Sequence, residues 1–139
     1  MKILKFGGKS LSNGDGINKV IAIITDKVNQ GEAIAVVVSA RGNATDELEE
    51  ILHLASNNGD YKPLFEKFKN YQQDVYHDVD LSEEFNILEK LFEGVSLTGD
   101  YSNKIKDQVL SKGELLSAKL LTAILVEKGI QAHFEVTRL

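Results

Sequence analysis

The sequence contains no cysteine, a single proline and no run of basic residues. Without cysteine the chain has no disulfide, no thiolate metal site and no cysteine nucleophile, a composition that fits a reducing compartment. The formal net charge is −5 over 139 residues. This charge argues against nucleic acid as a partner, because phosphate backbones are bound by basic surfaces.

Long hydrophobic runs are missing as well. A transmembrane helix needs about 20 consecutive apolar residues, and no stretch of the chain approaches that length. Lys2 and Lys5 flank only a very short apolar run, which does not have the pattern of a secretory signal. The hydrophobic fraction of 42% is sufficient for one globular domain with its own core. We therefore expect a cytoplasmic domain with no membrane partner.

Three aliphatic segments predict buried parallel strands: residues 1–6, 33–40 and 130–136. The second is almost continuously apolar, as expected for a strand covered on both faces. Between the first two, apolar residues recur at helical spacing, and Gly31 is expected to end that helix. A strand, a helix and a second strand in this order predict a βαβ unit with a right-handed crossover, and therefore an α/β fold.

Residues 45–112 are mostly charged and polar, with apolar side chains spaced as on one face of a helix. Turn-forming residues at 58–60, 79–80 and 98–100 predict breaks between helices, so we expect a helical insertion between the second and third strands. A largely apolar helix over 113–129 is expected to pack deep against the sheet. Because the third strand would leave an open sheet edge where the chain stops, we expect an incomplete domain.

The segment KFGGKS follows the first strand directly. It is not a nucleotide-binding P-loop, because that motif needs a glycine five residues before its Gly-Lys-Ser, where this chain has Ile3. Lys5 lies at the carboxyl end of the strand, where open α/β sheets bind ligands.

An anion site at this turn would use several kinds of group. Gly7 and Gly8 allow the backbone to approach an anion, Ser10 offers a hydroxyl and Lys9 adds charge. The alternative is an ordinary strand-to-helix turn with a solvated lysine.

A second polar segment, SARGNATDEL, follows the second strand. Ser39 lies at the carboxyl end of that strand, at the position equivalent to Lys5 in the first strand. Gly42 frees the backbone, and Thr45 or Asp46 starts the next helix. A hydroxyl together with helix-start N–H groups suits a carboxylate or a phosphate. The alternative is plain N-capping by Thr45.

Glu114 is a third candidate, because it follows Gly113 at the expected start of the most apolar helix. A carboxylate there is favoured by the helix dipole alone; the functional alternative is a contact with a substrate ammonium group. His53, His77 and His133 have no ligand spacing, so we assign no metal site to protein side chains.

Taken together, KFGG, VVVSARGNATD and GELLSAKLL resemble, in order and spacing, the amino-acid kinase family and, within it, the N-terminal part of the aspartate kinases. The resemblance covers essentially the whole chain. It implies a mostly parallel sheet sandwiched by helices. It also implies transfer of the γ-phosphoryl group of ATP to the side-chain carboxylate of L-aspartate. The product would be 4-phospho-L-aspartate, on the route to lysine, threonine and methionine.

The resemblance also implies a role for each matching residue. Lys5 would be catalytic and would stabilise the phosphoryl group during transfer. The ATP phosphates would be bound by Lys5, Phe6, Gly7, Gly8 and Ser10. Mg²⁺ would be bound through those phosphates. Lys9 departs from the family pattern, which usually has threonine or serine at that position.

On the acceptor side, the resemblance implies that Ser39 and Thr45 hold aspartate and that Glu114 faces its ammonium group. Phosphoryl transfer requires positioning and charge neutralisation. No general base is needed, because the aspartate carboxylate is already ionised at neutral pH.

Several alternatives stay open. Family members continue well beyond this length into a nucleotide-binding half, so the chain by itself is expected to have no turnover. The start MKILKFGG resembles enzymes fused to homoserine dehydrogenase, and a monofunctional parent is the alternative. A homodimer is expected. The acceptor could instead be glutamate, N-acetylglutamate or carbamate, or the chain could be a non-catalytic amino-acid-binding module.

Overall fold

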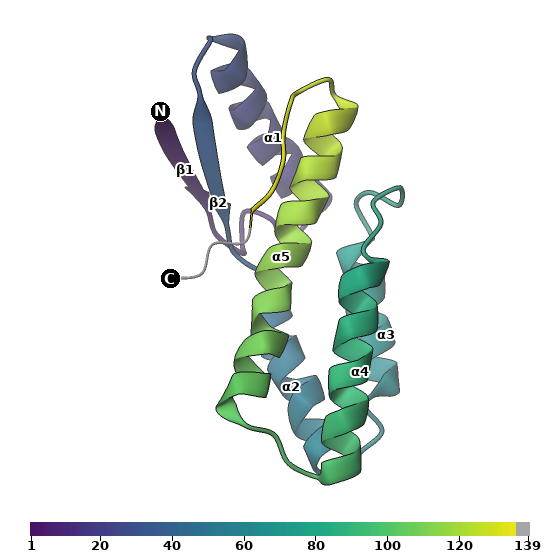
Figure 1. The fold of residues 1–139 in the computed structure, drawn as a ribbon. Helices are drawn as coiled ribbons and strands as arrows, with labels where there is room; N and C mark the ends of the chain where they lie inside the picture. The colour runs from purple at the N-terminus through teal and green to yellow at the C-terminus, as the bar shows by residue number, and fades with distance from the viewer. Residues whose placement is uncertain (136–139) are drawn as a thin grey trace.

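The computed structural model describes residues 1–135, and its first part is the predicted βαβ unit (Figure 1). The elements β1 (Lys2–Phe6), α1 (Gly14–Asn29) and β2 (Ile34–Val38) follow one another along the chain. The two strands pair in parallel, with Lys5 beside Val37. The α/β class and the parallel pairing are therefore confirmed.

The helix α1 has the apolar face that its spacing predicted. Asn13 caps the start of the helix, and its side-chain oxygen accepts the Gly16 N–H at 2.9 Å. Gly31 follows the helix with φ of +82°, a left-handed conformation that glycine adopts without steric cost. The residues of α1 that are buried in the core are Ile17, Val20, Ile21 and Ile24.

The predicted third strand is not formed over its described residues. Residues 130–135 belong to no strand, and the sheet within residues 1–135 has two strands. Ile130 and Ala132 pack against the core, while Gln131, His133 and Phe134 are exposed, so only part of the segment is buried. A strand also requires a hydrogen-bonded ladder with a neighbour, and these residues pair with none. Val136 lies outside the described residues.

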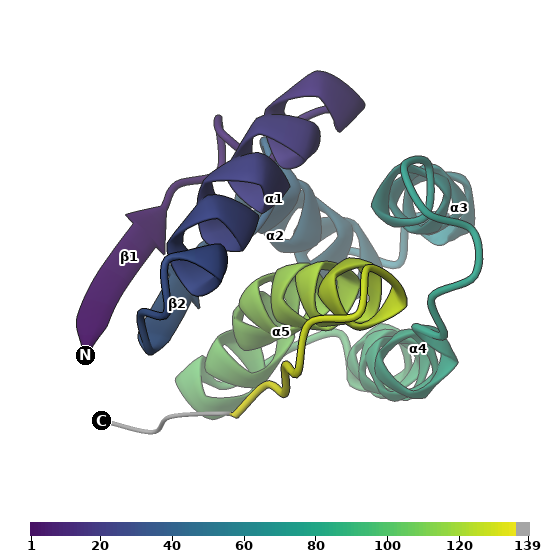
Figure 2. The ribbon, with the colours of Figure 1, turned by 90° about the horizontal axis from the view of Figure 1, so that it is seen from above.

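One face of the sheet is uncovered in the part of the chain that the structure describes. Figure 2 shows α1 and α5 on the same side of β1 and β2. On the opposite side the side chains of Ile3 and Val37 are 65% and 51% exposed. The expectation that the second strand is covered on both faces is therefore wrong within residues 1–135. An apolar run alone does not show which faces of a strand are covered.

The segment after β2 is helical, with breaks close to the predicted ones. Asn58 and Gly99 both have positive φ, of 58° and 74°, in the connections between helices. The helices are α2 (Ala44–Ser56), α3 (Lys62–Gln72), α4 (Ser82–Thr98) and α5 (Asn103–Glu127). The bounds of an insertion at about 45–112 stay a prediction.

The helix α5 is longer than predicted and joins the two parts of the molecule. It begins at Asn103, where the Ser102 hydroxyl accepts the Ile105 N–H at 3.2 Å, and it passes through Gly113 without a break. One end packs with α2 and α4 and the other with α1 and β2 (Figure 1). Within residues 1–135 no helix is both long and apolar enough to cross a membrane.

Candidate functional site

The carboxyl ends of β1 and β2 lie side by side, and the chain turns away from the sheet at both. Lys5 is the second-last residue of β1 and is exposed, whereas Phe6 is half-buried against the core. The Phe6 carbonyl accepts the Ser39 N–H at 3.1 Å. Ser39 is exposed and lies one residue beyond β2, so it stands at the level of Gly7 and not, as expected, at that of Lys5.

Residues 7–12, here called the glycine turn, lead from β1 toward α1. Two backbone hydrogen bonds fold this turn: Leu11 N–H donates to the Gly8 carbonyl at 3.2 Å, and Ser12 N–H donates to the Lys9 carbonyl at 3.3 Å. The side chains of Lys9 and Ser10 are exposed. The turn therefore has a fixed backbone and exposed polar side chains.

The glycine turn is joined to the loop that follows β2. Gly42 N–H donates to the Gly8 carbonyl at 2.9 Å, and a Cβ at Gly8 would lie only 2.6 Å from the Ala40 carbonyl oxygen. In the described part of the chain, no atom beyond Gly7 itself and its two neighbours in sequence lies within 4 Å of the place that a Cβ at Gly7 would occupy. The chain's own packing thus requires glycine at position 8 but not at position 7, where a ligand could approach the backbone.

Thr45 lies in the first turn of α2 and is exposed. The alternative, that Thr45 caps the helix, is wrong, because the helix begins at Ala44 and the cap position is Asn43, whose side chain makes no capping hydrogen bond. Gly42, with φ of +52°, turns the chain into the helix earlier than the sequence suggested. N-capping therefore does not account for Thr45.

Glu114 lies in the middle of α5 and not at a helix start. Gly113 before it is buried and faces the loop after β2, since a Cβ there would lie 2.8 Å from the Ala40 Cβ. This contact brings α5 against that loop at the residue next to Glu114, whose side chain is exposed. A helix dipole favours carboxylates only in the first turn, so the dipole does not explain Glu114.

Sequence analysis missed Arg41, whose side chain is fully buried in the loop after β2. Its Nε donates to the Leu11 carbonyl at 2.7 Å, and its Nη2 donates to the Ser12 carbonyl at 3.3 Å. A buried charge needs partners, but the residue type alone does not reveal that the side chain turns inward. Only the juxtaposition of the two loops could have identified it.

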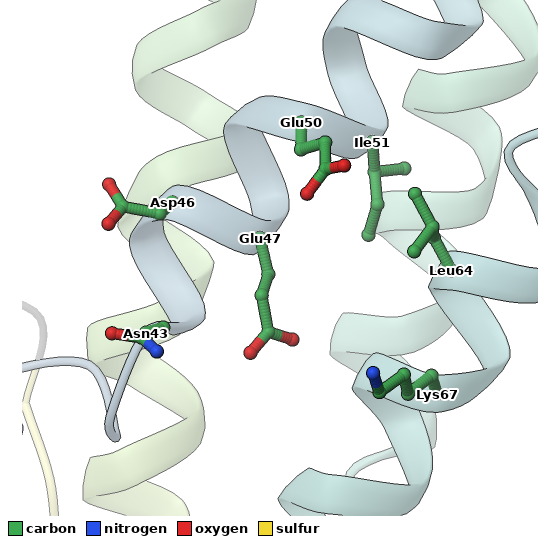
Figure 3. Close-up of a pocket in the computed structure, with 7 residues that line it drawn as sticks. All are labelled: Asn43, Asp46, Glu47, Glu50, Ile51, Leu64 and Lys67. Carbon is green, nitrogen blue, oxygen red and sulfur yellow. The ribbon is translucent and has the colours of Figure 1, made fainter.

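A pocket of about 370 Å³ lies between α2 and α3 beside this region (Figure 3). Its carboxylates come from α2 and its lysine from α3, and it includes none of the predicted ligand-binding residues. The lining residues are Asn43, Asp46, Glu47, Glu50, Ile51, Leu64 and Lys67. Over residues 1–135 no three His, Cys, Asp or Glu side chains are arranged to hold a metal ion.

Two curated relatives match most of this chain but only part of their own length. The bifunctional aspartokinase/homoserine dehydrogenase of Buchnera aphidicola is 33% identical over 93% of this chain and 17% of its own length. Aspartokinase 3 of Bacillus subtilis is 32% identical over 96% of this chain and 31% of its own length. The chain therefore spans less than a third of either relative.

A solved structure and a family model agree with these relatives. The crystal structure of Escherichia coli aspartokinase III in complex with aspartate and ADP matches with a TM-score of 0.74 and 26% identity, over 96% of this chain and 30% of that one. Residues 1–138 match the model of the amino acid kinase family. Since that match covers nearly the whole chain and agrees with the observed fold, the chain belongs to the amino acid kinase family.

Proposed function

We propose that the protein carrying this chain transfers the γ-phosphoryl group of MgATP to the side-chain carboxylate of L-aspartate. The observation that carries this proposal is the meeting of three segments at the carboxyl end of the sheet. The Gly8–Gly42 hydrogen bond joins the glycine turn to the loop after β2, and the Gly113–Ala40 contact adds α5 to them. The relatives named aspartokinase support the choice of aspartate.

The glycine turn forms the phosphate side of the proposed site. Lys5 neutralises charge on the phosphoryl group during transfer, a task that suits an exposed ammonium group at the strand end. Backbone N–H groups bind the ATP phosphates, and the opening beside Gly7 allows close approach. The residues assigned to ATP are Lys5, Phe6, Gly7, Gly8 and Ser10.

The acceptor side uses the loop after β2 and the middle of α5. Ser39 and Thr45 donate hydroxyl hydrogen bonds to aspartate, and Glu114 pairs with its ammonium group. All three side chains are exposed, and within residues 1–135 none of them makes a side-chain hydrogen bond or ion pair. Their polar groups are therefore available to a ligand.

The nucleotide would bring Mg²⁺ to the proposed site. This ion keeps several waters and is bound largely through substrate phosphates, so it would be held by the nucleotide and not by a cluster of protein side chains. When bound, it neutralises phosphate charge. The residues of this chain position the two substrates and supply the lysine charge beside the transferring group.

The test is ADP release by the full-length protein that carries this chain, with MgATP and one acceptor at a time. The acceptors are L-aspartate, L-glutamate, N-acetylglutamate and carbamate. Turnover with aspartate supports the proposal, and turnover with another acceptor would replace the substrate while keeping the reaction class. If none of the four is phosphorylated, a non-catalytic amino-acid-binding module becomes the better description.

Homodimerisation and a cytoplasmic location stay predictions.

A further inference from the structure

Arg41 connects three separate segments of the chain through one buried side chain. It is 0% exposed, and its guanidinium reaches the carbonyls of Leu11 and Ser12 in the glycine turn at 2.7 and 3.3 Å. It also donates to the Tyr71 carbonyl at 2.8 Å and to Asp74 Oδ1 at 3.1 Å. The loop after β2, the glycine turn and the end of α3 are thus held by one charged group.

Tyr71 completes this connection from the helical part of the molecule. The guanidinium carbon of Arg41 lies 4.3 Å from the centre of the Tyr71 ring, which is cation–π geometry. The Tyr71 hydroxyl donates to the Ser12 carbonyl, and a Cβ at Gly42 would lie 2.7 Å from that hydroxyl. Burial raises the pKa of Tyr71 above its usual value, so the hydroxyl stays a donor.

These contacts fix the orientation of backbone groups in the glycine turn. A peptide unit is planar, so holding the Leu11 carbonyl toward Arg41 also fixes the direction of the Ser12 N–H. That N–H closes the turn on the Lys9 carbonyl at 3.3 Å. Three donors reach the carbonyls of Leu11 and Ser12, two from Arg41 and one from Tyr71.

The energetics favour a positioning role over a purely stabilising one. Burying a guanidinium is costly, and an apolar side chain of similar size is often as stable. Asp74, its acidic partner, has a side chain 46% exposed, so the pair gains little from mutual burial. What Arg41 provides that an apolar residue cannot is a rigid fork of donors aimed at two consecutive carbonyls.

We propose that Arg41 is a positioning residue that, with Tyr71 and Asp74, holds the glycine turn in its phosphate-binding geometry. This inference rests on the proposed function, since it requires that the turn binds ATP phosphates. Through the contacts of Arg41 with Tyr71 and Asp74, α3 influences nucleotide affinity without contacting a substrate.

The experiment measures binding of MgADP and of aspartate to the full-length protein by calorimetry, together with the melting temperature. Tyr71→Phe removes the hydroxyl and keeps the ring under Arg41. Arg41→Lys keeps the charge and removes the fork. Tyr101→Phe is the matched control, because Tyr101 is a half-buried tyrosine before α5, outside this contact.

We expect Tyr71→Phe to weaken MgADP binding about fivefold, which corresponds to the loss of one hydrogen bond. Its affinity for aspartate should stay within about twofold of the wild-type value. Arg41→Lys should weaken MgADP binding more than about tenfold, and Tyr101→Phe should bind as the wild type does. If Arg41→Lys does not fold, Tyr71→Phe decides alone. Wild-type MgADP affinity in Tyr71→Phe would overturn the proposal whatever happens to the melting temperature.

The proposed function fails separately from this inference. If the wild-type protein binds MgADP but releases no ADP with aspartate, the assignment of aspartate as the acceptor is wrong. The comparison of the variants still decides the role of Arg41. A wild-type protein that does not bind MgADP overturns the positioning role as well, since no phosphate site would then exist to be positioned.

Discussion

The Gly8 carbonyl accepts a hydrogen bond of 2.9 Å from the Gly42 N–H, and this bond holds the two loops at the carboxyl end of the sheet against each other. At Gly8 the neighbouring backbone leaves no room for a Cβ, whereas the space beside Gly7 is open within the described residues. Two adjacent glycines thus have different physical requirements, and a substitution at each one tests a different property.

Gly8→Ala should lower the free energy of unfolding by about 1–3 kcal/mol, because its methyl group would overlap the Ala40 carbonyl. Gly7→Ala should leave stability within about 0.5 kcal/mol and raise the KM for MgATP, since its methyl group would enter the space assigned to phosphate. Urea unfolding and steady-state kinetics on the full-length protein measure both. A wild-type KM for MgATP in Gly7→Ala would show that no phosphate approaches there.

Lys5→Met should reduce kcat by about 100- to 1,000-fold, the usual loss when a group that stabilises transition-state charge is removed. Because Lys5 is exposed, the melting temperature should not change. Lys9→Met is the matched control, since it removes an exposed lysine from the adjacent turn, and it should retain most of kcat. Equal kcat values in the two variants would remove Lys5 from the catalytic assignment.

Glu114→Gln should reduce kcat/KM for aspartate by roughly 30-fold, or about 2 kcal/mol, because the substrate ammonium group would lose its carboxylate partner. The matched control is Asp107→Asn, which neutralises another exposed carboxylate of α5. Glu114→Gln also distinguishes between the possible acceptors. An acylated amine has no charge for Glu114 to pair with, so the variant should not affect kinetics with such an acceptor. Unchanged kinetics with aspartate would count against a free amino group at this position.

The parts of the fold that depend on local patterns could be predicted from the sequence. The helical spacing of Ile17, Val20 and Ile24 identified α1, and Gly31 marked its end. The aliphatic segments before and after it gave two parallel strands. The resemblance to the amino-acid kinase family rested on three motifs, and the match over residues 1–138 confirms it.

The predictions that were wrong concern features that depend on tertiary contacts. Gly113 suggested a helix start, but it lies inside α5 because the helix packs too closely against Ala40 for a larger residue. The apolar residues in 130–135 suggested a buried strand, but apolar composition does not show whether a neighbouring strand is there to pair with. Arg41 gave no signal, because its partners lie in the glycine turn and α3, both distant in the sequence.

Glu84 and Lys119 form an ion pair between α4 and α5, with side chains only 4% and 14% exposed. A second carboxylate, Glu83, lies 3.5 Å from the Lys119 Nζ, but its side chain is 76% exposed, so it compensates the lysine charge only weakly. Removing Glu84 leaves Lys119 charged and largely desolvated, so Glu84→Gln should destabilise the fold by about 3 kcal/mol, at the lower end of the range for breaking a buried pair. The pair of Lys106 and Glu49, at 36% and 47% exposure, is the control. Because water screens it, Glu49→Gln should cost less than about 1 kcal/mol.

Urea unfolding of the two variants measures the difference, and a double variant, Glu84→Leu with Lys119→Leu, separates pairing from packing. Replacement of both charges by apolar side chains removes the uncompensated charge and should recover most of the stability lost in Glu84→Gln. If Glu84→Gln and Glu49→Gln cost the same, burial does not strengthen the connection between α4 and α5. The junction would then be held by apolar contacts such as those of Leu88 and Leu116, both 0% exposed.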